Sequence, residues 1–287
     1  MARAAWFTNG FRLATDLWDP SHRYETSWIL PPWLLFAIRL LIGLYILVTR
    51  FFIIGWSCTH ESEGGCTAVV NSFSFFTVLT FWGLGFYFIV AAIHTGTYAF
   101  RGRPLLDSFP RILQALHGLY YTTICTMPLL VTVVYWAILS DSRERSVFSN
   151  WSNISQHAAN SAFALFEIII PRTSHEQLLL VHMLWLVIIL ALYLSLAYLT
   201  EATRGFYPYP FLDPEENGRG VLAGYILGIA VASIIFFWIA KGLVWVRQWL
   251  TERKMGMDGK FAGQPTYDSY DTEMGTVTRR EKSNGTK

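Results

Sequence analysis

The sequence predicts an all-α protein, a polytopic integral membrane protein built as a bundle of six transmembrane helices. Three observations lead to this prediction. The 287 residues are 53% hydrophobic and only 15% charged, and the mean hydropathy of +0.35 is high for a soluble protein. Six apolar runs are candidates for crossing a bilayer. Fifteen of the 22 Lys and Arg residues fall on one side if the N-terminus is cytosolic.

The predicted membrane domain covers residues 33–246. Residues 1–32 are polar and are interrupted by Asp19-Pro20 and Pro31-Pro32, which predicts an irregular cytosolic arm. Residues 247–287 are rich in Gly, Thr and charge, which predicts a disordered cytosolic tail. The six helices are expected at residues 33–56, 73–97, 116–139, 155–170, 178–199 and 221–246.

The fourth run is the shortest, at sixteen residues, and it is also the most polar. Asn160 and Glu167 follow His157 by three and ten residues, which places all three on one face of an ideal helix. A polar stripe inside a bilayer is costly, so it normally faces the bundle interior and often a functional cavity. The run is kept as a span because five spans would put the basic tail on the wrong side.

Thr80 in the second run lies at a depth similar to that of Asn160. With a rise of about 1.5 Å per residue, Thr80 lies about 10 Å and Asn160 about 8 Å from the outer face. Thr80, Tyr87 and His94 recur every seven residues and give this helix its own polar edge. Two such edges at one depth predict a small polar pocket. Alternatively, Thr80 bonds only a carbonyl one turn back, Asn160 joins two helices, and His157 is solvated at the interface.

Arg39 and Glu167 are charged residues placed within the predicted spans. Their depths are about 9 Å and about 12 Å from the inner face, which is compatible with a buried ion pair. Such a pair would orient two helices or serve a transport role. Alternatively, the Arg39 side chain extends to the inner surface of the membrane.

Two outer segments carry further features. Cys58 and Cys66 share one short loop, which permits a disulfide in an oxidising compartment, although two free thiols fit equally well. Residues 205–214 hold three prolines and four aromatic residues, which predicts a stiff cap over a pocket or a membrane-interface belt. Asn150 and Asn153 lie in glycosylation acceptor patterns, but so close to the fourth run that poor modification is expected.

Four short patterns occur in order along the chain. They are FFTVLTFWGLGFYF at residues 75–88, Met127-Pro128 followed by Tyr135-Trp136, QHAANS at residues 156–161, and GFYPYPFL at residues 205–212. Taken together, they resemble the androgen-induced membrane protein family and also rolling-stone-like proteins. The similarity covers most of residues 20–245, and the forms NSAFALFEIIIPR and YLTEATRGFY resemble the fungal branch most.

The resemblance to the androgen-induced family implies an intramembrane hydrolase of fatty-acid esters of hydroxy fatty acids, with a threonine nucleophile and a histidine. Carried over by motif, the threonine falls on Thr80 and the catalytic histidine falls on Asn160, whereas the first histidine of the pattern is present as His157. Asparagine forms hydrogen bonds but cannot take the proton of a threonine hydroxyl. The resemblance to rolling-stone-like proteins implies a membrane protein without an enzymatic role.

Three functions are therefore open. The first is a lipid-ester hydrolase with Thr80 as nucleophile, His157 as surrogate base and Asn160 positioning the substrate. The second is a non-catalytic membrane protein that binds lipid or protein partners. The third is a small transporter, which Glu167 suggests but for which inverted repeats are lacking. We expect no cofactor, no metal and no nucleic-acid partner. The expected partner is membrane lipid, such as a long-chain ester. The expected location is the endoplasmic reticulum, elsewhere in the endomembrane system, or the plasma membrane.

Overall fold

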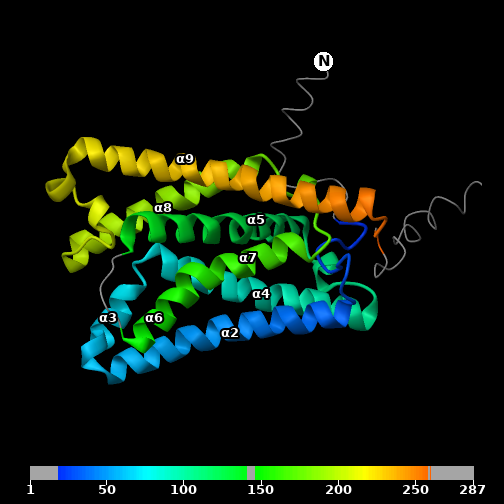
Figure 1. Ribbon diagram of the computed structural model, residues 1–287, viewed down its shortest axis with the longest axis horizontal. Helices are drawn as coiled ribbons and strands as arrows, with labels where there is room; N and C mark the ends of the chain where they lie inside the picture. Colours follow the sequence, from blue (N-terminus) through cyan, green and yellow to red (C-terminus); the bar gives the residue numbers. More distant parts are fainter. Residues whose placement is uncertain (1–18, 141–145, 258, 260–287) are drawn as a thin grey trace, which may run out of the picture.

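The computed structural model describes residues 19–140, 146–257 and 259, and within them the chain is helical and forms no strand. Five long helices run along one axis (Figure 1), and each is long and apolar enough to span a membrane. The predicted all-α class is confirmed for these residues. The five helices are α2 (Pro32–Thr59), α4 (Phe76–Arg101), α5 (Arg111–Val134), α8 (Val181–Arg204) and α9 (Pro214–Gln248).

The fourth predicted run, residues 155–170, is not a single α-helix. It consists of a π-helical segment (Ser155–Ala159) and α7 (Asn160–Ile169), and α6 (Val147–Ile154) directly precedes it. The run still connects the two ends of the bundle. Before α6 the Ser146 hydroxyl donates to Glu63, and after α7 the Ile170 carbonyl accepts from the Ser27 hydroxyl at 2.7 Å. This traverse is not among the five helices that are long and apolar enough to span a membrane.

Shorter elements complete the fold. The hydropathy pattern does not predict α3 (Gly65–Ser72), which follows α2. A π-helical segment at Trp249–Lys254 continues α9 beyond the point where the tail was expected to begin. Residues 1–18 of the predicted arm and residues 260–287 of the predicted tail lie outside the described residues. The remaining short elements are Tyr135–Leu139 (π-helical) and the 3-10 turns Glu61–Glu63, Leu105–Ser108, His175–Gln177 and Pro210–Leu212.

Proline, aspartate and glycine set several helix ends. α2 begins at Pro32 and α9 at Pro214, where the missing N–H group would have had no helical partner. The Asp213 side chain accepts from two backbone N–H groups in the first turn of α9, at 2.8 and 3.3 Å. α4 ends at Arg101, and the next residue is Gly102, whose φ of 72° is in the left-handed region that favours glycine.

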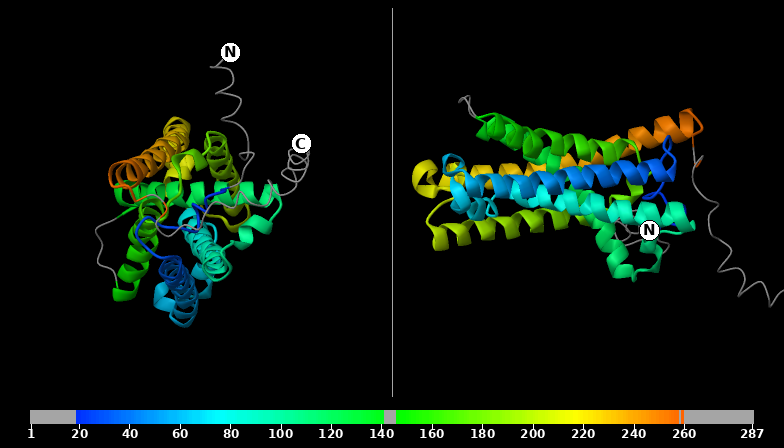
Figure 2. Two further views of the ribbon diagram at one scale, coloured as in Figure 1. Left: turned by 90° about the vertical axis from the view of Figure 1, so that its right-hand side faces the viewer. Right: turned by 90° about the horizontal axis from the view of Figure 1, so that it is seen from below.

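The two ends of the bundle are built differently (Figure 2). Residues 19–31 pack across one end, which we call the arm end, and the Arg172 N–H donates to the Thr26 carbonyl there at 2.9 Å. The opposite end carries α3, α6 and residues 205–213, together with the disulfide described below, and we call it the disulfide end.

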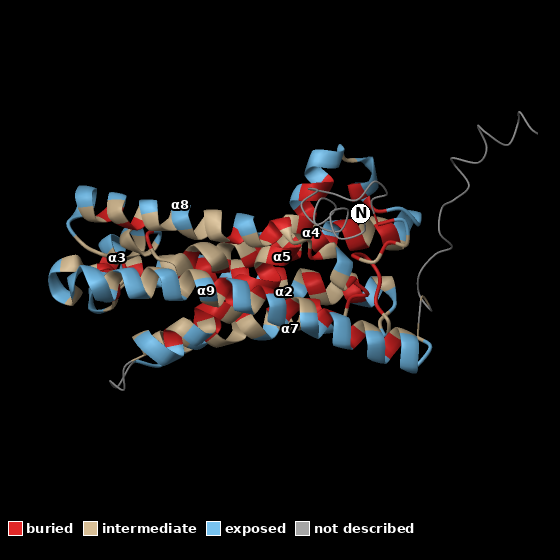
Figure 3. Ribbon diagram, turned by 90° about the horizontal axis from the view of Figure 1, so that it is seen from above, coloured by how far each residue is buried: buried red, intermediate tan, exposed pale blue. Residues whose placement is uncertain are grey.

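The core lies in the middle of the bundle, where buried residues gather around α4 and α5 (Figure 3). Tyr121 of α5 is fully buried and makes an edge contact with Tyr24 of the arm, with ring centroids 5.5 Å apart. α2 and α4 approach closely at glycine positions. A Cβ atom on Gly85 would lie only 2.8 Å from Ile46, so this helix pair depends on the missing side chain.

Candidate functional site

Thr80 lines a cavity of about 360 Å³ between α4, α5 and α8, here called the Thr80 cavity. Its hydroxyl lies 3.0 Å from the carbonyl oxygens of both Phe76 and Thr77 in its own helix. A threonine in an apolar helix often satisfies its hydroxyl in this way. The structure therefore shows the hydrogen bond within the helix that the sequence offered as the alternative for Thr80. Neither His157 nor Asn160 lines this cavity.

Asn160 joins α7 to α5. Its side chain is buried, and Oδ1 accepts from the Thr132 hydroxyl at 3.0 Å and from the Ser161 N–H at 2.7 Å. The Ser161 hydroxyl in turn donates to the Pro128 carbonyl at 3.1 Å. These bonds connect two apolar helices through polar side chains, so the helix-joining alternative describes the position of Asn160.

His157 lies in the π-helical segment and stacks on Tyr135, with ring centroids 3.6 Å apart. Its Nδ1 is 3.0 Å from the Asn153 carbonyl oxygen, which only accepts, so this contact requires hydrogen on Nδ1. His157 lines a second cavity, of about 350 Å³, together with Thr77 and Tyr209. The threonine that the structure brings to the cavity of His157 is therefore Thr77.

Thr77 and Tyr209 were not singled out from the sequence. Thr77 precedes Thr80 by about one helical turn, so depth and periodicity alone do not separate the two hydroxyls. The Thr77 N–H donates to the Tyr209 hydroxyl at 3.4 Å. Burial raises the pKa of the Tyr209 phenol, and its hydrogen bond with Thr77 opposes this only in part. Tyr209 is therefore a neutral hydrogen-bonding group at the wall of the cavity.

A third cavity, here called the apolar cavity, lies between α4, α5, α8 and α9 and has a volume of about 310 Å³. It adjoins the His157 cavity because Thr77, Tyr135, Leu139 and Tyr209 line both. Residues 208–210 line the His157 cavity, and the next two residues of that loop line the apolar cavity. The loop therefore caps pockets at the disulfide end, as one of the two sequence alternatives expected.

Arg39 and Glu167 form a buried ion pair, the alternative with which their depths were compatible. The Arg39 side chain is 1% exposed and that of Glu167 is fully buried. Two parallel bonds join them, Nε to Oε1 at 2.8 Å and Nη2 to Oε2 at 2.7 Å. The remaining nitrogen, Nη1, donates to the Tyr24 carbonyl and to the Thr95 hydroxyl. Glu167 lines none of the three cavities, so its surroundings favour helix orientation over transport.

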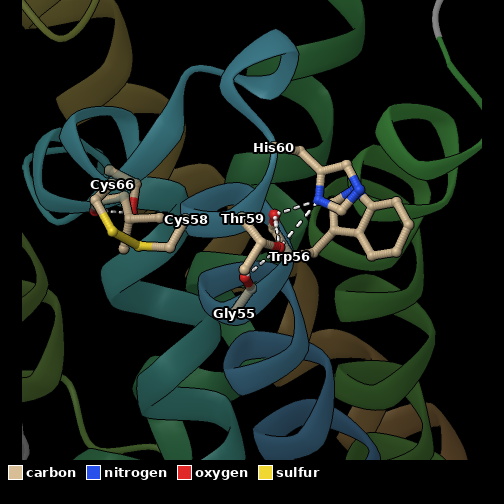
Figure 4. Close-up of a disulfide and its surroundings, with 8 residues drawn as sticks. Gly55, Trp56, Cys58, Thr59, His60 and Cys66 are labelled. Atoms are coloured by element: carbon tan, nitrogen blue, oxygen red, sulfur yellow. Dashed lines mark hydrogen bonds between the residues drawn. A yellow bond between two sulfur atoms is a disulfide. The ribbon is translucent and has the colours of Figure 1, made fainter.

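Cys58 and Cys66 are joined by a disulfide, with their Cα atoms 4.2 Å apart (Figure 4). The bond ties the last turn of α2 to the first turn of α3. Trp56 and His60 stack beside it, with ring centroids 3.9 Å apart. Disulfides persist in oxidising compartments. Cys125 is a buried free thiol in the core.

No family model, curated protein or solved structure matches this chain. The resemblance to the androgen-induced and rolling-stone-like proteins therefore stays a hypothesis, and the function has to be argued from the geometry of the cavities.

Proposed function

We propose that the chain is a multi-pass membrane protein with six traverses and with its arm end in the cytosol. Five apolar helices and the run α6–α7 supply the traverses, and the disulfide at the opposite end supports the orientation. The outer faces of the long helices support insertion because they expose large apolar side chains to the surroundings. Examples more than half exposed are Leu41, Val48, Phe51, Leu192, Leu199 and Leu227.

The function that this geometry supports best is the binding of a lipid chain in the apolar cavity. The cavity itself carries the proposal, because its walls are almost wholly apolar and its volume of about 310 Å³ is within the range of small-molecule sites. Thr77 and Tyr209, which carry hydroxyl groups, are among the lining residues, which suits a ligand with a polar head. This is the non-catalytic alternative among proteins of the androgen-induced or rolling-stone type.

A pair of matched substitutions in α9 tests lipid binding. Ala230 lines the apolar cavity, whereas Ala223 is exposed on the same helix. We expect Ala230→Phe to fill the cavity and to reduce saturable labelling by a photoactivatable monoacylglycerol at least fivefold, with the protein in lipid nanodiscs. Ala223→Phe should leave the labelling unchanged. Equal labelling of the wild type and both variants would overturn the proposal.

Ester hydrolysis is the second candidate, and the shared cavity of Thr77 and His157 favours it. A threonine nucleophile needs a nearby base that takes the proton of its hydroxyl before it attacks the ester carbonyl. The test is fatty-acid release from a long-chain ester by the purified protein and by Thr77→Val, Thr80→Val and His157→Gln. Selective loss in Thr77→Val and His157→Gln would support this candidate. Loss in Thr80→Val would instead favour the residue that the resemblance implies, and absence of wild-type turnover would rule hydrolysis out.

A further inference from the structure

α2 carries two buried arginines with different surroundings. Arg39 and Arg50 are eleven residues apart, about three turns, so they lie on nearly the same face of the helix. Each is 1% exposed. Arg39 has Glu167 as a bidentate counter-ion, whereas no ion pair joins Arg50 to a carboxylate anywhere in the described part of the chain.

The partners of Arg50 are neutral. Its Nη1 donates to the Gln156 side-chain oxygen at 2.7 Å, its Nη2 lies 3.5 Å from the Ser72 hydroxyl, and its guanidinium carbon is 5.8 Å from the centre of the Trp82 ring. Among the residues that the structure describes, its buried Nε has no hydrogen-bond partner. Arginine does not lose its proton in proteins, so the positive charge stays in a low-dielectric site. Such an uncompensated charge is strongly destabilising and marks a functional position when it lies within a membrane.

Gln156 connects this charge to the cavities. It accepts a hydrogen bond from Arg50 and also lines the His157 cavity, so one side chain links the guanidinium to that cavity. Neither the His157 cavity nor the adjoining apolar cavity is lined by Asp or Glu. No carboxylate on the cavity walls therefore cancels the positive potential of Arg50.

We propose that the joined cavities take a single-chain lipid with an anionic head group, carboxylate or phosphate, whose charge compensates Arg50. The head lies at the Gln156 and Thr77 side, and the hydrocarbon chain extends into the apolar cavity between α4, α5, α8 and α9. This inference rests on the proposed lipid binding and adds the charge of the ligand. A neutral or cationic head in the same place would leave the buried guanidinium uncompensated.

The experiment compares head groups on one chain length. The full chain in zwitterionic nanodiscs is titrated with hexadecanoate, hexadecyl phosphate, methyl hexadecanoate and hexadecylamine, each competing with the photoactivatable monoacylglycerol. Wild-type protein should bind both anions at least tenfold more tightly than the ester or the amine. A preference for only one anion identifies the head group. Equal affinity for acid and ester would overturn the inference while leaving lipid binding intact, and no saturable binding of any lipid would overturn both.

Substitutions then assign the preference to Arg50. Arg50→Met should abolish the tenfold preference for anions without changing the affinity for the methyl ester, and Arg50→Lys should retain most of the preference. Arg204→Met is the matched control, because Arg204 is exposed at the same end and bonds Asn71. An unchanged preference in Arg50→Met, or an equal loss in Arg204→Met, would contradict the inference. Should Arg50→Met fail to fold, the wild-type comparison of acid with ester still decides it.

Discussion

Glu167→Gln is expected to destabilise the protein strongly, because it removes the charge that compensates Arg39 while keeping nearly the same shape. Both side chains are at most 1% exposed, so water cannot replace the lost partner. Removing one member of a buried ion pair costs about 3–5 kcal/mol. For a domain of this size, each kcal/mol of lost stability lowers the melting temperature by about 2–4 °C, so the melting temperature should fall by about 6–20 °C. Arg39→Met combined with Glu167→Leu should recover most of this decrease, because neither charge is then left buried and alone.

The buried thiol of Cys125 provides the assay. A thiol-reactive fluorogenic dye should label it only on unfolding, since the other two cysteines form the disulfide. Apparent melting temperatures are measured in detergent for the wild type, Glu167→Gln, the Arg39→Met/Glu167→Leu double variant, and the exposed control Glu216→Gln. A Glu167→Gln decrease no larger than that of Glu216→Gln would refute the reasoning. So would a double variant at least as unstable as Glu167→Gln, because packing rather than charge would then explain the loss.

Three further predictions use the same preparation. Gly85→Ala should lower the melting temperature relative to Gly83→Ala, because overpacking costs about 1–3 kcal/mol of stability. A Cβ added at Gly85 lies 2.8 Å from α2, whereas one added at Gly83 meets nothing within 4 Å. Equal shifts in the two variants would contradict the close α2–α4 approach. A maleimide reagent should add one label to the denatured, non-reduced chain and three after reduction, because Cys58 and Cys66 are bonded; three labels before reduction would exclude the disulfide. Burial raises the pKa of the Glu25 carboxyl well above its ordinary value of 4.5, so folding favours its protonated form and stability should fall as pH rises from that value through the folded pKa. Glu25→Gln should flatten this fall, and an unchanged pH profile of the melting temperature would contradict the assignment.

The long helices were predictable because an apolar run of about 20 residues has few alternatives to a helix. The capping loop was one of two alternatives, because prolines and aromatic rings restrict where residues 205–214 can lie. The fourth run was harder to predict, since the sequence gives no signal for a π-helical segment at Ser155–Ala159. A π turn holds more residues than an α turn, so each of its residues turns the chain by less than the about 100° of an α-helix. The face on which His157 was placed relative to Asn160 and Glu167 assumed an uninterrupted α-helix.

The sequence therefore determines the depth of a residue along a membrane helix better than the direction in which its side chain points around the helix. An extra residue in a helix changes depth by only about 1.5 Å but turns every later side chain by about 100°. Arg39 and Glu167 tolerate such errors because both side chains are long and their charges attract, and their predicted pairing is found at 2.7 Å. A threonine hydroxyl is one bond from Cβ and has no such reach. Compatible depths were thus enough for two long charged side chains to meet, whereas the Thr80–His157 site required a direction that the sequence does not supply. The threonine that lines the histidine's cavity is Thr77.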